Sequence, residues 1–182
     1  MSLLTPMLRS SPLTDWFSDA QRVQGMLDFE AALAQAQAVC GMVPPEAVGP
    51  IVAACRHETI DFAALGEAAV GAGNLAIPLV KQLTVQVKAR DPEAARYVHW
   101  GATSQDAIDT GLVLQLRGAL DAAETLLEQL LAALALQADR YRDTVMPGRT
   151  WMQHALPVTF GLKLAGTLDA LLRWQQRLRE MR

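Results

Sequence analysis

The amino-acid sequence predicts an all-α protein, in which a small N-terminal helical domain leads into the first long helices of a central multi-helix bundle. Of the 182 residues, 51% are hydrophobic and only 5% are aromatic. The abundant Ala and Leu favour helices over sheets. Apolar side chains recur at helical spacing along most of the chain. A proline-free run from about residue 104 to 143 predicts one helix too long for a compact domain.

Two helices are expected first. The spacing of apolar residues predicts a helix over 14–42, with Gly41 as its stop signal. Pro44 and Pro45 suit the start of a second helix, because proline is tolerated in a first turn. This second helix is expected to end near residue 56.

Two further helices are expected before the long run. The third starts at residue 60 or 61 and ends near the glycines at 71 and 73. The fourth begins at Asn74, tolerates Pro78 in its first turn and ends near residue 89. Asp91 and Pro92 then form a turn.

The long helix, 104–143, bears on assembly. Its 38 or so residues span roughly 57 Å, whereas a globule of this chain length is about 40 Å across. It carries two apolar stripes, so burial on more than one side is expected. One stripe consists of Leu112, Leu116, Ala119, Ala123, Leu126, Leu130 and Leu134, and the other of Val113, Leu120, Leu127, Leu131 and Ala138. We therefore expect an intermolecular bundle; the alternative is a kink at Gly118. Pro147 and Gly148 break the run, and a last helix follows from about residue 157.

Composition excludes several functions. The net charge of −3 and the lack of any Lys/Arg block argue against a nucleic-acid surface. The N-terminus does not resemble a signal peptide, and the longest apolar run, 130–136, is far shorter than the ~20 residues of a membrane span. Cys40 and Cys55 lack metal-type spacing and are expected to be reduced core residues. The sequence thus predicts a soluble, cytoplasmic protein.

Two clusters of polar residues are the candidates for a functional site. The first, YVHWGATSQDAIDT (97–110), brings together His99, Thr103, Ser104, Gln105, Asp106 and Asp109. Ser104 and Asp106 are expected to cap the long helix, whose N-terminus also favours an anion. The second, RTWMQHALP (149–157), contains Arg149, Thr150, Trp151, Gln153 and His154. His57, by contrast, is expected to be a solvated surface residue.

These segments carry a family resemblance. The first cluster resembles the H-x-G-x-T-S-x-D-x-x-D-T segment of the fumarase/aspartase/adenylosuccinate lyase superfamily, and RTWMQHALPVTFG resembles its R-T-H-x-Q-x-A-x-P-x-T-x-G segment. MLDFEAALAQAQ is similar to the superfamily's N-terminal helix. Together with GNLAIPLVKQL, these motifs are most similar to its cycloisomerase branch, the lactonising enzymes of protocatechuate breakdown.

The resemblance implies a fold, an assembly and a reaction. Residues 1–105 are expected to form the N-terminal domain and 106–182 the start of a long-helix bundle, in a homotetramer whose active sites combine several subunits. The implied reaction adds a substrate carboxylate across a double bond of 3-carboxy-cis,cis-muconate, without metal or organic cofactor. The family's G-S-S-x-M-P-x-K-x-N-P loop, with its catalytic serine, is not in this sequence. The chain is therefore expected to be a fragment, inactive alone.

Site residues are carried over by the same resemblance. The expected catalytic residues are His99, Ser104 and His154. The expected substrate-binding residues are Asn74, Thr103, Gln105, Arg149, Thr150, Trp151 and Gln153. Asp106 and Asp109 are expected to organise the loop and the helix start.

Trp151 is the main departure from the motif, because most relatives have a histidine there that is often assigned to proton transfer. This tryptophan favours a cycloisomerase over the eliminating lyases. Two alternatives remain open. One is a lyase that eliminates fumarate from a succinyl adduct, and the other is a non-catalytic helical oligomerisation module in which the polar clusters serve as caps.

Overall fold

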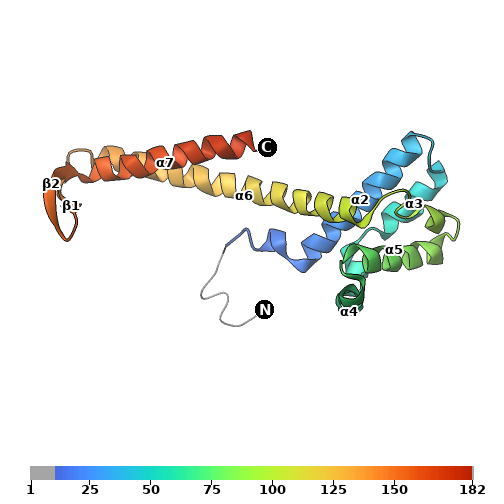
Figure 1. The fold of residues 1–182 in the computed structure, drawn as a ribbon. Helices are drawn as coiled ribbons and strands as arrows, with labels where there is room; N and C mark the ends of the chain where they lie inside the picture. Colours follow the sequence, from blue (N-terminus) through green and yellow to red (C-terminus); the bar gives the residue numbers. More distant parts are fainter. Residues whose placement is uncertain (1–10, 182) are drawn as a thin grey trace. The chain divides into compact units, whose positions relative to one another are not determined.

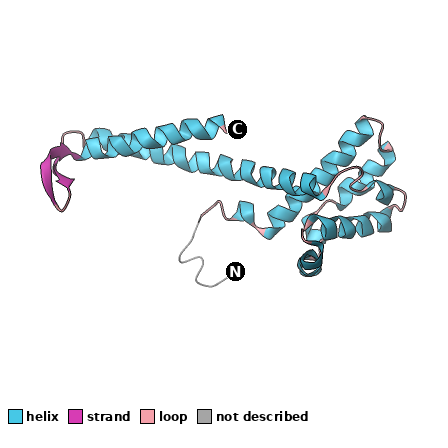
Figure 2. Cartoon of the chain, in the orientation of Figure 1, coloured by secondary structure: helices cyan, strands magenta, loops and turns pink. Residues whose placement is uncertain are grey.

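The structure, a computed structural model, describes residues 11–181. The chain divides into two compact units, Met1–Gly118 and Ala119–Arg182. Over the described residues, six α-helices, three short 3-10 helices and one two-stranded hairpin make up the regular structure (Figures 1 and 2). The predicted all-α class is confirmed, with the hairpin as its one addition.

The first predicted helix is shorter than expected. A 3-10 turn, η1 (Asp15–Phe17), is separated by Ser18 from α2 (Asp19–Val39). Ser18 is extended, and its hydroxyl accepts from the backbone N–H of Gln21 at 3.3 Å, so it caps α2 instead of continuing a helix from residue 14. At the other end Gly41 has a φ of 70°, which confirms it as part of the stop.

The next helices match their predictions closely. They are α3 (Pro45–Ala54), α4 (Phe62–Ala72) and α5 (Ala76–Arg90), with η2 (His57–Thr59) and η3 (Ala94–Tyr97) between and after them. Asp61 caps α4 by accepting from the N–H of Ala64 at 3.0 Å, and Gly73 ends it with a φ of 76°. Around α2 they enclose the core of the first unit, whose largest fully buried side chains are Leu27, Ile51, Leu65, Leu79, Leu83, Val43 and Val87.

One expectation about the end of α2 was wrong. Cys40 is exposed, although the sequence placed it in the core, whereas Cys55 is buried as expected. Val39, the residue before Cys40, is also 89% exposed. Both residues lie in the last turn before Gly41, where the helix ends.

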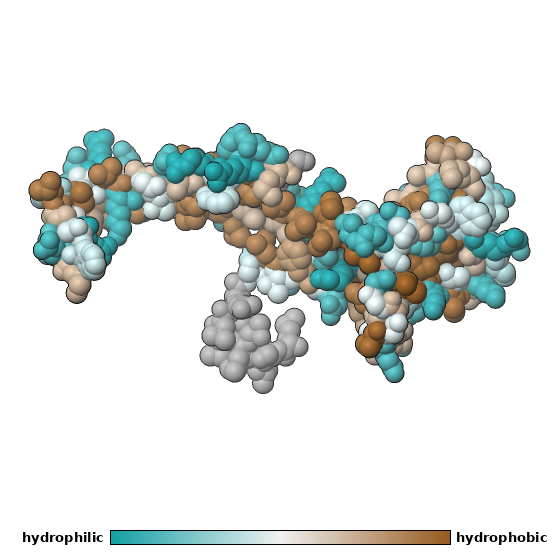
Figure 3. All heavy atoms as spheres, in the orientation of Figure 1, coloured by the Kyte–Doolittle hydropathy of each residue, from teal (hydrophilic) through white to brown (hydrophobic). Residues whose placement is uncertain are grey.

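The long helix is continuous. The α6 helix (Ser104–Arg140) spans 37 residues as one helix, so it is not divided at Gly118 into two shorter helices. Each of its two apolar stripes is buried only in part. Ala119 of the first stripe and Leu131 of the second are buried, whereas Leu112, Leu116, Leu126 and Leu130 of the first and Val113 of the second are exposed. Figure 3 shows this hydrophobic surface along α6.

The second unit contains an element that the sequence analysis missed. Strands β1 (Val145–Thr150) and β2 (Gln153–Thr159) form an antiparallel hairpin, where only a break at Pro147 and Gly148 was expected. Periodicity pointed to a helix from residue 157, but α7 (Phe160–Glu180) begins at Phe160, because the Thr159 hydroxyl accepts from the N–H of Leu162 at 3.1 Å.

Helix α7 returns along the second unit's part of α6 (Figure 1). Gly161 allows the close approach at the hairpin end, since a Cβ there would lie 2.5 Å from the carbonyl oxygen of Ala138. At the opposite end, Arg179 Nε pairs with Glu124 Oε1 at 3.2 Å. None of the helices in residues 11–181 combines the length and apolar character that a bilayer crossing requires.

Candidate functional site

His99 contacts a buried carboxyl group of helix α2. Its Nδ1 lies 2.6 Å from Oε1 of Glu30, and the His99 side chain is 16% exposed while that of Glu30 is 2% exposed. His99 itself adopts a left-handed backbone conformation, with φ at 57°. A non-glycine residue holds this conformation only when its surroundings stabilise it. The structure thus places His99 as the link between the polar loop and the core.

A second buried polar side chain of α2 holds the same loop. Gln37 donates from Nε2 to the carbonyl oxygen of Trp100 at 2.6 Å. Glu30 and Gln37 are seven residues apart, or about two helical turns, so they lie on one face of α2. They continue its buried stripe of Val23, Met26, Leu27 and Ala34.

The start of α6 is fixed by a hydrogen bond from the backbone of Thr103 to the side chain of Asp106. Ser104 is the first helical residue, not the cap as expected; Thr103 precedes the helix. Asp106 Oδ2 accepts from the backbone N–H of Thr103 at 2.9 Å, as the third helical residue does in a capping box. Gln105 Nε2 donates to Asp109 Oδ1 one turn on. Both aspartates thus organise this segment, while Thr103 and Gln105 remain exposed.

Asn74 lies apart from this cap, at the start of α5. Its Oδ1 accepts from the N–H of Ile77 at 3.1 Å, which is a local turn contact. It also lines a cavity of about 270 Å³ in the first unit, together with Arg22, Met26, Leu75, Ile108, Leu112 and Gln115. Among these, Arg22 provides the positive charge.

The second polar cluster forms the end of the hairpin. Thr150 pairs with Gln153 and Arg149 with His154 across the two strands, and Trp151 and Met152 form the turn. Met152 has a φ of 57°, and Trp151 is 86% exposed. The residues of this cluster are all exposed. The hairpin therefore presents these side chains to the surroundings of the second unit.

The predicted residues fall into two groups. His99, Thr103, Ser104 and Gln105 lie within one stretch at the start of α6, with Asn74 in the same unit. Arg149, Thr150, Trp151, Gln153 and His154 share the hairpin of the other unit. Each group thus lies within a single unit.

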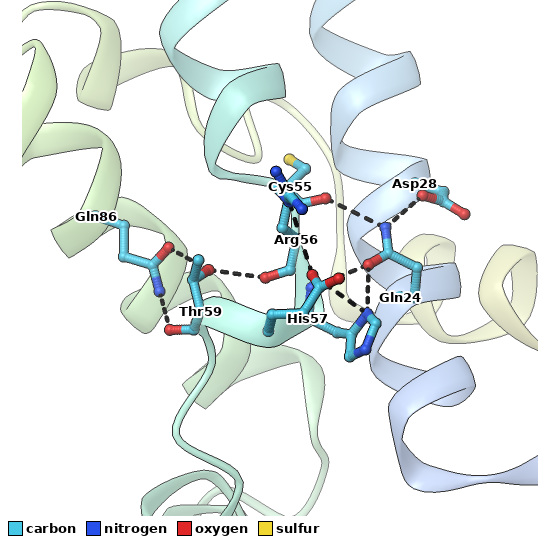
Figure 4. A network of polar contacts seen from close by, with 8 residues as sticks. Gln24, Asp28, Cys55, Arg56, His57, Thr59 and Gln86 are labelled. Carbon is cyan, nitrogen blue, oxygen red and sulfur yellow. Dashed lines mark hydrogen bonds and ion pairs between the residues drawn. The ribbon is translucent and has the colours of Figure 1, made fainter.

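His57, expected to be a solvated surface residue, has a side chain that is 30% exposed and that also contacts helix α2. Its backbone N–H donates to Oε1 of Gln24 at 2.9 Å, and its ring Nδ1 lies 3.1 Å from the same oxygen (Figure 4). Gln24 also donates from Nε2 to Asp28 Oδ1 at 2.7 Å and to the Cys55 carbonyl at 3.2 Å. The amide of Gln24 therefore ties α2 to the α3–η2 connection, and this histidine is structural.

Burial shifts two pKa values near the Glu30–His99 contact. Desolvation raises the pKa of Glu30 above its ordinary value of 4.5, and the neighbouring His99 opposes this only in part. Desolvation, followed by the charges of Glu30 and Asp28, raises the pKa of the Cys55 thiol to about 12. Cys55 thus stays protonated and is no nucleophile at neutral pH.

Glu30 and Gln37 are the polar residues that the sequence analysis missed. Both stand in the motif MLDFEAALAQAQ, which was used only as a family resemblance. The available signal was their register, since they occupy the spacing of the apolar stripe that precedes them. A carboxyl group at such a position needs a partner inside the fold.

Comparison with known proteins supports the family resemblance of the sequence motifs. The family model described as "Lyase" matches residues 8–182, which is almost the whole chain. The chain therefore belongs to this lyase family, as its motifs indicated.

The chain is 62% identical over 173 residues to a 3-carboxy-cis,cis-muconate cycloisomerase of Pseudomonas aeruginosa, covering 95% of this chain and 38% of that protein. It is similar to the crystal structure of the 3-carboxy-cis,cis-muconate lactonizing enzyme of Pseudomonas putida, with a TM-score of 0.96 and 56% identity. That match covers 99% of this chain and 41% of the other. The chain thus spans well under half of the length of these relatives.

Proposed function

We propose that this chain is the N-terminal part of a cycloisomerase that converts 3-carboxy-cis,cis-muconate into a carboxymuconolactone, in protocatechuate breakdown through the β-ketoadipate pathway. The observation that carries the proposal is the 62% identity to the Pseudomonas aeruginosa cycloisomerase. The polar clusters at residues 97–110 and 149–157 supply groups that the reaction needs. A cytoplasmic location is part of the proposal.

The reaction sets three chemical requirements. One carboxylate oxygen attacks an alkene carbon, a C–O bond forms, and the π electrons move to a carbon next to another carboxylate. That carbon then takes up a proton. Because one of three carboxylates becomes a neutral ester, each turnover consumes one proton. The site must therefore bind polyanions, stabilise the carbanion and donate a proton to carbon.

The first cluster meets these requirements in part. The N-terminus of α6 offers free N–H groups and a favourable dipole for a carboxylate, beside the hydroxyls of Thr103 and Ser104 and the amide of Gln105. His99 provides a titratable ring for proton transfer. Asn74 adds an amide from the same unit. We assign substrate binding to these residues, with proton transfer assigned to His99 and stabilisation of developing charge to Ser104.

The hairpin supplies the second group of side chains. Arg149 pairs well with carboxylates, and Thr150 and Gln153 can donate hydrogen bonds to them. Trp151 has no proton to transfer at neutral pH, so His154 is the hairpin's candidate for proton transfer. The exposure of the whole cluster is consistent with a hairpin that faces substrate or another subunit.

Assembly belongs to the same proposal. The exposed leucines of α6 form an apolar stripe of the kind that other helices cover in a bundle. We propose a homotetramer with residues 1–105 as the N-terminal domain and 106–182 as part of the bundle. Sites would then combine clusters from different copies.

A chimera tests the proposed reaction. Residues 1–182 replace the corresponding N-terminal part of the Pseudomonas aeruginosa relative, and loss of the absorbance of 3-carboxy-cis,cis-muconate is followed. The chimera should consume the substrate, and the 182-residue chain alone should not. Ser104→Ala and His99→Asn chimeras should each lose about 10²-fold or more in kcat. An assembled tetrameric chimera that leaves the muconate untouched but releases fumarate from a succinyl adduct would support the lyase alternative, and one that binds neither substrate would support the scaffold.

A further inference from the structure

The buried face of α2 is unusual because it contains two polar side chains. Glu30 is 2% exposed and Gln37 is 9% exposed. Both reach the same two-residue stretch, His99 and Trp100, just ahead of α6. Burying a polar group is costly unless it is hydrogen-bonded, and each of these two side chains has a partner in that stretch. Gln37 holds a backbone carbonyl, whereas Glu30 contacts a titratable ring.

The two nitrogens of His99 have different surroundings. Nδ1 faces the core, 2.6 Å from Glu30 Oε1. Among residues 11–181, the buried side-chain atoms that lack a hydrogen-bond partner are Glu30 Oε2 and Gln37 Oε1. Nε2 of His99 is not one of them and has no partner in the described part of the chain, so it is reached by solvent. The ring thus has one nitrogen inside and one outside.

From this geometry we propose that Glu30 is the positioning residue of His99, holding Nδ1 so that the proton exchanged with substrate is always the one on Nε2. This inference rests on the proposed role of His99 in the cycloisomerase. The chemical argument is that the hydrogen bond at one ring nitrogen determines the protonation of the other.

The proton balance follows from the pair. With one exchangeable proton bound, Nε2 carries N–H and can donate to the carbanion carbon, where a C–H bond forms as the N–H bond breaks. The pair is left as the Glu30 carboxylate accepting from Nδ1–H, with a lone pair on Nε2. Solvent then returns a proton to Nε2, which matches the one proton consumed in each turnover.

The backbone supports this role. His99 has a φ of 57° and Gly101 a φ of 71°, so the loop turns back sharply. The carbonyl between them, at Trp100, is anchored by Gln37. A non-glycine residue in the left-handed region is strained and persists where contacts fix it. The loop conformation therefore aims the ring at Glu30.

Nitrogen NMR of the 182-residue chain tests the positioning without any enzyme assay. The chain has three histidines, so the rings can be assigned with His57→Asn, His99→Asn and His154→Asn variants. At a pH where the rings are neutral, His99 should carry its proton on Nδ1. In Glu30→Leu it should become a mixture of tautomers. Gln37→Met is the matched control, since it loosens the same loop without touching the ring, and should keep the Nδ1–H tautomer.

The chimera gives the second readout. Glu30→Gln keeps the shape of the side chain but removes its charge, so kcat should fall roughly 10-fold to 100-fold with KM within about 2-fold. Glu67→Gln, an exposed carboxyl on α4, controls for the loss of charge. Glu30→Asp should restore part of the kcat. If Glu30→Leu does not fold, the kcat of Glu30→Gln decides.

The outcomes separate the two proposals. An unchanged His99 tautomer in folded Glu30→Leu, or an unchanged kcat in Glu30→Gln, overturns the positioning role while an active chimera keeps the cycloisomerase. A chimera without activity, combined with the expected change of tautomer, overturns the cycloisomerase and leaves Glu30 as the residue that orients His99.

Discussion

Gly25 of α2 and Gly111 of α6 cross backbone to backbone. A Cβ built on Gly25 would lie 2.8 Å from the carbonyl oxygen of Gly111, and one built on Gly111 would lie 2.9 Å from the backbone nitrogen of Met26. Only glycine at both positions permits this approach. The crossing lies one to two turns from Glu30 on α2 and from Ser104 on α6, so it sets the separation across which Glu30 reaches His99.

Gly25→Ala should destabilise the first unit, because the added methyl meets backbone that cannot move aside. Overpacking of this kind costs about 1–3 kcal/mol. Chemical denaturation followed by circular dichroism measures the free energy of unfolding. Gly66→Ala is the matched control, since it lies in helix α4 with open space around a Cβ, and should stabilise by roughly 0.4–1 kcal/mol. Equal effects of the two substitutions would contradict the crossing.

Asp106→Ala should weaken the start of α6. It removes the acceptor of the Thr103 N–H at 2.9 Å, and loss of a cap costs roughly 0.5–2 kcal/mol. Amide hydrogen exchange should speed up at Thr103 and in the first turn. Asp109→Ala removes only a contact with the Gln105 side chain and should leave Thr103 exchange unchanged. Faster Thr103 exchange in Asp109→Ala than in Asp106→Ala would show that Asp109, and not Asp106, caps the helix.

The two cysteines should differ sharply in reactivity. Burial raises the pKa of Cys55 to about 12, so at pH 8 about one thiol in 10⁴ is ionised, and the side chain is also shielded. Cys40 is exposed. A thiol-reactive dye should therefore label one cysteine per native chain, and none in Cys40→Ser. Denaturation should restore labelling of Cys55. Labelling of native Cys40→Ser at the rate of a free thiol would show that Cys55 is accessible.

Local chemistry allowed several helix ends to be predicted from the sequence. Pro45, Asp61 and Gly73 marked helix ends correctly, because caps and φ preferences act within one turn. Ser18 was passed over, although it caps α2 by the same chemistry. The hairpin escaped detection because its strands are exposed and contain Pro147 and Pro157, which suppress any strand pattern.

The candidate site likewise contains residues that the sequence identified and one residue that only the structure identified. The residues of the two polar clusters were found from composition and motif order, whereas Glu30 was not. Its partner, His99, is 69 positions away in the chain, and a contact at that range is set by helix crossing. Spacing could have placed Glu30 on the apolar face of α2, but only the fold identified what that face meets.

The stability of the chain should depend on pH through Glu30. Burial raises the pKa of its carboxyl above the ordinary 4.5, so between the two values the folded chain holds a proton that the unfolded chain has released. By linkage, the contribution of Glu30 to the free energy of unfolding falls as pH rises through this window and is constant above it. Urea denaturation of wild type and Glu30→Gln from pH 4.5 to 8 should give a wild-type advantage that shrinks with rising pH. Glu67→Gln accounts for the change in net charge. A wild-type advantage that grows with pH instead would mean that the contact with His99, and not burial, determines how Glu30 titrates.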